Sequence, residues 1–185
     1  NRAREPLDAL RTIAITDGIP ELVRLFDFQK SFAENLSPLF AHDSAYFCYA
    51  ESELRRNFRT PETYNILLYG MATGYNRISQ LSEFSGFPQN KCDKYLKALD
   101  KAGLLETEQK KDAAGHIRTH YYPKGGYWKT WFRYVFPSQG RYLEVQKEEA
   151  LQQLVDEMDK TIVVEYFKKV CWNWLEKNYH SCYWD

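Results

Sequence analysis

Glycines divide the middle of this 185-residue chain into short helical segments, and two segments with alternating residues follow them. The first helical segment begins at Pro61, and Gly74, Gly86 and Gly103 mark the ends of successive segments. Proline suits the first position of a helix, and glycine commonly follows the last. The alternation beyond Gly103 is typical of two strands that pair in a hairpin. This order predicts three helices followed by a small β-hairpin.

The three helical segments carry apolar residues at the spacing of one helix face. These residues are Tyr64, Leu67, Leu68 and Met71 in the first segment, Ile78, Leu81 and Phe84 in the second, and Cys92, Tyr95, Leu96 and Leu99 in the third. The stripe is clearest in the third segment, because lysines project from its opposite side at about 100° per residue. We expect Cys92, which lies on this stripe, to be a buried thiol.

The order of three helices and a hairpin over residues 60–123 predicts a winged helix-turn-helix. The third helix of such a domain usually enters a DNA groove, and the hairpin, or wing, usually touches the DNA backbone. The residues expected to face the groove are Gln89, Asn90, Lys91, Lys94 and Lys97, and those expected to contact the backbone are Lys111 and Arg118. The sequence therefore predicts double-stranded DNA as a partner.

The charge balance leaves a second hypothesis open. Four lysines in residues 89–101 stand against two aspartates, and the three basic residues of the wing stand against three acidic ones. The whole chain has a formal net charge of zero and a pI of about 7.1. Strong DNA-binding proteins usually carry a heavier basic surface. The alternative is a protein–protein or interdomain regulatory module that binds no DNA.

The residues on both sides of the predicted winged helix are also expected to be helical. Residues 1–59 predict a small lid-like helical subdomain, with a break at 16–20 and a short charged helix over 51–58. In residues 124–185, a turn at 124–126 precedes a dense aromatic run over 128–137, which predicts a buried connector helix.

Two helices are expected from Glu144 onward, and the second has a large apolar face. Its members are Val163, Tyr166, Phe167, Val170, Cys171 and Trp174. A face of this size needs a partner surface, either in this chain, in a further part of the protein or in another copy.

Four segments resemble the prokaryotic family of archaeal-type ATPases, a branch of the AAA-related P-loop superfamily. Thr16-Asp17-Gly18-Ile19-Pro20, followed by Leu25-Phe26-Asp27, is similar to the Gly-x-Pro element of the family. Phe58-Arg59-Thr60-Pro61-Glu62-Thr63-Tyr64 is similar to its entry to the winged helix. Lys94-Tyr95-Leu96 through Gly103-Leu104-Leu105 resembles its recognition helix, and Trp131-Phe132-Arg133-Tyr134-Val135-Phe136-Pro137 resembles its aromatic signature. Together these segments span about residues 10–175.

The resemblance implies a longer parent protein, of which this chain is a C-terminal fragment. The parent would have an N-terminal ATPase domain that binds ATP and Mg²⁺, and residues 144–185 would begin a nuclease-like domain. Carried onto this chain, Pro20 would contact adenine and Gly18 would permit its close approach. The chain departs from the family at Asp17, where a second glycine is common, and in its shorter, less basic wing.

The sequence carries no recognisable catalytic arrangement, so we expect the fragment to be non-catalytic. It has no G-x-x-x-x-G-K-[ST] loop, and residues 125–130 imitate only part of one. The four cysteines form no C-x-x-C pair and the four histidines are scattered, which argues against a metal site. A third possibility is that these residues orient substrate in a larger nuclease. The cysteine usage and the lack of a signal peptide or of about 18 successive apolar residues predict a cytoplasmic protein without a membrane span.

Overall fold

Helices make up most of the structure, a computed structural model that describes residues 5–137 and 148–179. The helices before the hairpin are α1 (Pro6–Thr16), α2 (Pro20–Val23), α3 (Phe32–Leu39), α4 (Ala45–Asn57), α5 (Pro61–Ala72), α6 (Ile78–Ser85) and α7 (Gln89–Lys101). The hairpin strands β1 (Leu105–Lys111) and β2 (Ile117–Pro123) precede α8 (Gly125–Thr130), the π-helical segment η1 (Trp131–Val135), α9 (Glu148–Met158), the π-helical segment η2 (Asp159–Val163) and α10 (Val164–Asn178). The prediction of a mostly helical fold with a small hairpin is confirmed.

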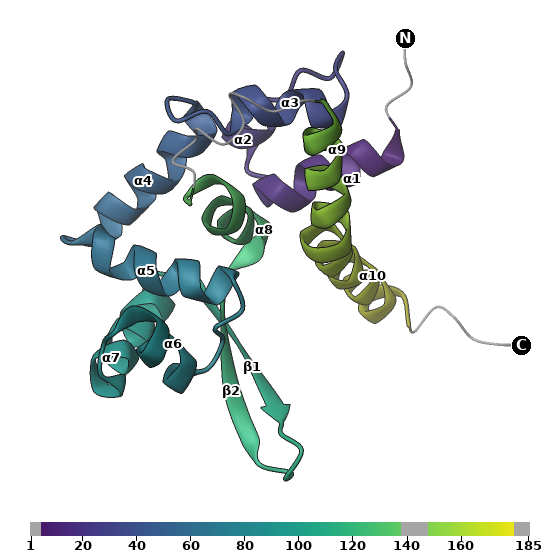
Figure 1. The fold of residues 1–185 in the computed structure, drawn as a ribbon. Coiled ribbons are helices and arrows are strands. Elements are labelled where there is room, and N and C mark those ends of the chain that lie inside the picture. The colour runs from purple at the N-terminus through teal and green to yellow at the C-terminus, as the bar shows by residue number, and fades with distance from the viewer. Residues whose placement is uncertain (1–4, 138–147, 180–185) are drawn as a thin grey trace, which may run out of the picture.

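The hairpin projects from the body between two groups of helices. Figure 1 shows α5, α6 and α7 on one side of it and α9 and α10 on the other, with α8 near the centre. The strands are antiparallel, with Leu105 opposite Pro123 at the base and Lys111 opposite Ile117 near the tip. One continuous cluster of buried side chains contains residues from α1 through η2.

The helices of the middle segment begin and end where the sequence predicts. α5 has Pro61 at its first position, and Gly74, Gly86 and Gly103 all have positive φ angles. Cys92 on α7 is fully buried, as expected for a thiol on the apolar stripe. Local sequence signals therefore set the boundaries in this part of the chain.

α4 is longer than the charged helix expected over 51–58. It begins at Ala45 because the Ser44 hydroxyl accepts a hydrogen bond from the Phe47 N–H at 3.0 Å. Tyr46 and Ala50 in its first half are fully buried. The charged residues mark only the second half of α4, and its start depends on the Ser44 cap.

The aromatic run forms the buried connector helix that its composition predicts. Trp128 lies on α8 and Trp131 and Phe132 on η1, and all three are buried. The expected turn at 124–126 is wrong in part, because Gly125 and Gly126 already belong to α8.

The end of α1 explains why α8 begins with two glycines. Asp17 follows α1 with φ 51° and ψ 22°, a left-handed conformation that aspartate tolerates. Its carboxylate accepts hydrogen bonds from the N–H groups of Gly126 at 2.7 Å and Tyr127 at 3.0 Å. A Cβ atom on Gly125 would overlap this carboxylate, and one on Gly126 would overlap the Ala14 carbonyl oxygen.

Two buried tyrosines extend this junction into the core. The Tyr127 hydroxyl donates to the carbonyl of Tyr46 on α4, and the Tyr46 hydroxyl donates to the carbonyl of Ile15 on α1, both at 2.8 Å. The tyrosine rings also meet edge to face, with centroids 4.9 Å apart. These contacts fix α8 against α1 and α4, because each buried hydroxyl satisfies a main-chain acceptor.

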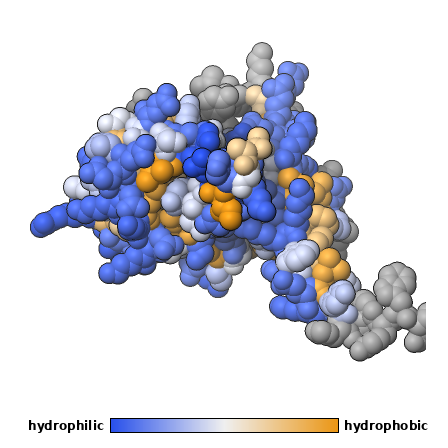
Figure 2. All heavy atoms as spheres, turned by 90° about the horizontal axis from the view of Figure 1, so that it is seen from below, coloured by the Kyte–Doolittle hydropathy of each residue, from blue (hydrophilic) through white to orange (hydrophobic). Residues whose placement is uncertain are grey.

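The C-terminal elements α9, η2 and α10 follow one another without an intervening loop. The Arg11 guanidinium on α1 contacts Asp159 on η2 through two hydrogen bonds, and this pairing joins the first and last parts of the described chain. No residue of α10 is buried, although its sequence is rich in aromatic and aliphatic residues. Figure 2 shows the apolar residues following one another along α10, toward the lower right.

A helix that crosses a bilayer needs about 20 successive, mostly apolar residues. No helix in the described part of the chain meets this requirement.

We expect Gly126→Ala to lower the free energy of unfolding by about 3 kcal/mol or more, because the new methyl group would overlap backbone that cannot move independently. Urea unfolding followed by circular dichroism measures this change. Lys124→Ala, at an exposed position just before α8, is the matched control and should change the stability by less than about 0.5 kcal/mol. Equal effects of the two substitutions would contradict the tight junction.

Candidate nucleic-acid interface

The outward face of α7 is a line of polar and basic side chains. Helical geometry places four residues within an arc of about 60°, on the side opposite the buried Cys92, Leu96 and Leu99. These residues are Asn90, Lys94, Lys97 and Lys101, and all four are exposed. Lys101 was absent from the residues predicted to face the groove, although the same lysine spacing includes it.

The structure gives the predicted groove residues different surroundings. The Lys97 ammonium donates to Asp93 at 2.6 Å, and this hydrogen bond raises the pKa of Lys97. Lys91 lies outside the arc, with its ammonium 4.0 Å from the centroid of the Phe87 ring. Gln89 is exposed at the first position of α7. The outward face therefore includes Lys94 and Lys97 but not Lys91.

The hairpin register sorts its side chains onto two faces, because directly opposed residues share a face. Lys111 shares a face with Ile117, and the Gln109 amide on that face donates to Thr119 at 3.0 Å. Arg118 lies on the other face, opposite Lys110. The structure therefore does not bring the two predicted wing contacts, Lys111 and Arg118, together.

The face that carries Lys111 is the one beside α7. Tyr121 belongs to this face, and its main chain forms hydrogen bonds with Asn76, between α5 and α6, at 2.8 and 2.9 Å. Burial raises the pKa of Tyr121, the charge of Asp93 raises it further and that of Lys97 lowers it. Both charged groups are on α7, so the Tyr121 side chain lies close to that helix.

The acidic residues of β1 lie on the face away from α7. Glu106 and Glu108 alternate with the residues of the Lys111 face and are opposed by Tyr122 and His120. The hairpin as a whole is neutral, but its face beside α7 carries no acidic residue between Leu105 and Lys111. A charge count that treats the wing as one unit misses this separation.

Asp112 organises the tip of the hairpin. Its carboxylate accepts hydrogen bonds from the N–H groups of His116 at 2.9 Å and Ala114 at 3.0 Å, and from Arg118 at 3.1 Å. These interactions, with the His116 N–H first, lower the pKa of Asp112. Arg118 therefore has a local anionic partner, and Lys111 is the exposed basic residue on the α7 side of the tip.

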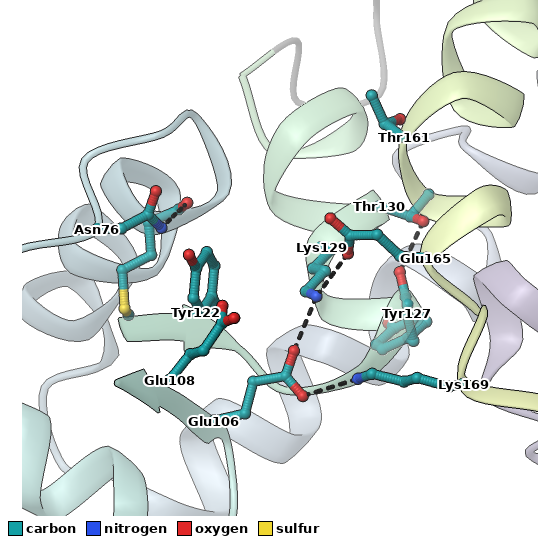
Figure 3. Close-up of polar contacts among 12 residues, drawn as sticks. Asn76, Glu106, Glu108, Tyr122, Tyr127, Lys129, Thr130, Thr161, Glu165 and Lys169 are labelled. Carbon is teal, nitrogen blue, oxygen red and sulfur yellow. Dashed lines mark hydrogen bonds and ion pairs between the residues drawn. The ribbon is translucent and has the colours of Figure 1, made fainter. Parts of the chain in front are cut away.

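A cluster of four alternating charges fixes the base of the hairpin to the C-terminal helices. Figure 3 shows Glu106 of β1 between Lys129 of α8 and Lys169 of α10. Its carboxylate is 2.8 Å from the Lys129 ammonium and 3.0 Å from that of Lys169, and Lys129 also contacts Glu165 at 2.9 Å. No local sequence pattern predicts this cluster, because its members come from β1, α8 and α10 and are far apart in the sequence.

The cluster stabilises the charged forms of Glu106 and Lys129. Burial alone would raise the pKa of Glu106, but hydrogen bonds and charges from Lys129 and Lys169 outweigh burial and lower it below 4.5. Burial would lower the pKa of Lys129, but Glu106 and Glu165 raise it. Folding therefore favours the charged forms of Glu106 and Lys129, and ion pairs on the acidic face hold the hairpin in place.

The predicted adenine contacts lie elsewhere in the fold. Gly18 has a φ of 69°, and the Thr16 hydroxyl accepts a hydrogen bond from its N–H at 3.3 Å. Pro20 is the first residue of α2, and both Gly18 and Pro20 are exposed. The structure does not bring these residues to α7, because α2 lies across the body from that helix (Figure 1).

A metal centre would need several ligating side chains close together. Within residues 5–137 and 148–179, no three His, Cys, Asp or Glu side chains lie close enough together to hold a metal ion. Comparison with models of protein families, with curated proteins and with solved structures gave no match to this chain. The geometry of α7 and the hairpin is therefore the main indication of a function.

We expect Glu106→Gln to lower the free energy of unfolding at pH 7 by about 1–2 kcal/mol, because two lysines lose their shared carboxylate. The pKa of Glu106 is lowered by folding, so its stabilising effect is complete above about pH 4.5 and is lost as the pH falls through the folded-state value. Thermal unfolding between pH 7 and pH 3 should show the two proteins converging at acid pH. Glu108→Gln, on the same strand face, is the control. A stability difference between Glu106→Gln and wild type that persists at acid pH would contradict the role given to the Glu106 ion pairs.

Proposed function

We propose that residues 60–123 form a winged helix that binds double-stranded DNA, with α7 in the major groove and the hairpin as the wing. The observation that carries the proposal is the alignment of two surfaces. The outward face of α7 lies beside the hairpin face that contains Gln109, Lys111 and Thr119, while Glu106 and Glu108 point to the other side. The sorting of charge supports DNA binding more than the net charge of the chain does.

The dimensions and chemistry of α7 suit a DNA groove. Its 13 residues span about 20 Å, and the major groove, about 12 Å wide, admits one α-helix. Lys94, Lys97 and Lys101 would neutralise phosphates without reading sequence. Asn90, at the start of the helix, could read a base edge, because an amide forms two hydrogen bonds with adenine.

The place of this unit in a larger ATPase is also a proposal, and the family resemblance is its main support. The contact between Asp17 and α8 could transmit a change at the nucleotide to the hairpin. A nucleotide near Gly18 and Pro20 would act next to Asp17, which caps α8 directly after the hairpin. Nucleotide state could thus move the wing relative to the helices before it.

We expect the 185-residue chain to bind duplex DNA with an affinity that falls steeply with salt, because lysine–phosphate contacts release counterions. Fluorescence anisotropy across a salt series should give a slope smaller by about 2–3 for Lys94→Ala/Lys97→Ala/Lys101→Ala than for wild type. Arg24→Ala/Lys30→Ala/Lys160→Ala removes the same charge elsewhere and is the control. Equal loss in both triple variants would show that net charge, not α7, determines binding, and no binding at low salt would refute the proposal.

The two faces of the hairpin give a sharper test with single substitutions. We expect Lys111→Ala to weaken DNA binding about 3- to 10-fold and to reduce the salt slope by about 0.9, because Lys111 shares the side of α7. Lys110→Ala should change the affinity less than about 2-fold, because Lys110 lies on the opposite face with Glu108 and Tyr122. The same anisotropy titration measures both, and a larger effect of Lys110→Ala would place the other face on DNA.

A further inference from the structure

Helix α10 presents an apolar surface that the described part of the chain leaves open. The exposed fractions are 51% for Phe167, 63% for Trp172 and 58% for Trp174, and Val170 and Leu175 are 42% and 49% exposed. Large exposed apolar patches on soluble domains usually mark interaction sites. The aromatic character of this patch is typical of protein–protein interfaces.

The polar edge of α10 is already occupied by its own chain. Glu165 and Lys169 form the ion pairs with Lys129 and Glu106 at the base of the hairpin (Figure 3). These contacts fix the rotation of α10 about its axis. The apolar residues therefore face away from the hairpin, where a partner can approach them.

Cys171 lies at the centre of the apolar arc. At 100° per residue, Phe167, Trp174 and Leu175 lie within about 60° of its direction, and Val170 and Trp172 lie about 100° to either side. Glu165 and Glu176 lie outside this arc, and Glu176 accepts a hydrogen bond from the Trp172 indole at 2.7 Å. No acidic group lies in the arc, so two copies of it can approach without repulsion between carboxylates.

We infer that α10 pairs antiparallel with α10 of a second copy of this chain, around a two-fold axis near Cys171. In this arrangement Phe167 of each copy lies opposite Trp174 of the other, on one side of the contact. Lys168 of each copy lies opposite the Trp172 ring of the other, on the second side. Aromatic pairs and a lysine over an indole ring are both favourable contacts.

The size of the apolar surface and the shape of the chain support a second copy of the chain as the partner of α10. The exposed parts of the five side chains amount to roughly 500 Å² per copy. A standard interface buries about 800 Å² per partner, and about 65% of a homodimer interface is apolar. The apolar area that each partner of such a homodimer buries is therefore similar to the exposed apolar area of α10. The body of the protein lies at the N-terminal end of α10 (Figure 1), so an antiparallel pair keeps the two bodies at opposite ends.

Sedimentation velocity of the full 185-residue chain, from about 5 to about 200 µM, tests this pairing. We expect a monomer–dimer equilibrium with a micromolar dissociation constant. Phe167→Ser/Trp174→Ser should raise that constant about 100-fold or more. The control Leu25→Ser/Ile117→Ser changes two exposed apolar residues, one between α2 and α3 and one near the hairpin tip, and should leave the dissociation constant unchanged.

Cross-linking at Cys171 tests the register of the pair. In a Cys48→Ser/Cys182→Ser background, copper–phenanthroline with oxygen should remove two protons and two electrons from the Cys171 thiols and form one intermolecular disulfide. A dimer that does not cross-link would overturn the pairing around Cys171. A chain that stays monomeric at all concentrations would overturn the proposal, and binding of that monomer to anionic lipid vesicles would assign the face to a membrane surface.

Discussion

The contact between the end of α1 and the beginning of α8 determines how the parts of this structure are arranged. Asp17 caps α8, and the two glycines at its start allow the backbone of α1 to lie directly against it. Only Lys124 separates β2 from α8, so the same contact fixes the origin of the hairpin. Any larger residue at Gly126 would move α8 and, with it, the hairpin. The orientation of the hairpin thus depends on a residue more than 100 positions earlier in the chain.

A neutral hairpin is compatible with the proposed DNA binding, because strand alternation separates its charges. Glu106 and Glu108 lie on one face, and Glu106 forms ion pairs with Lys129 and Lys169. The opposite face keeps Lys111 and polar side chains beside α7. The same carboxylate that lowers the net charge of the hairpin therefore fixes its position, and the α7 side of β1 carries no acidic residue. The net charge of the whole hairpin does not show that its two faces differ in charge.

Local signals predicted the elements, and long-range contacts decided how they meet. The periodicity of α5, α6 and α7 and the alternation of β1 and β2 depend on neighbouring residues, so the sequence alone predicted their bounds. Periodicity also predicted the outward positions of Asn90, Lys94 and Lys97 on α7. The predicted set differed from the outward face at Gln89 and Lys91, which lie outside the arc, and at Lys101, which it omitted. The ion pairs of Glu106 and the capping by Asp17 join residues that are far apart in the sequence, so no local pattern predicts them. The faces of the hairpin were implicit in its alternation, but which face meets α7 depends on the bonds between Tyr121 and Asn76.

The proposed DNA surface and the proposed pairing of α10 are mechanically connected. Lys169 of α10 contacts Glu106 of β1, so the helix that would pair two chains also holds the wing of each chain. A two-fold pair around Cys171 would relate two α7 helices by the same axis. Symmetric DNA-binding dimers use this relation to match two half-sites whose spacing is set by the distance between their recognition helices. Weakening the contact between Glu106 and Lys169 would then loosen that spacing without changing either binding surface, because the ion pair lies outside both.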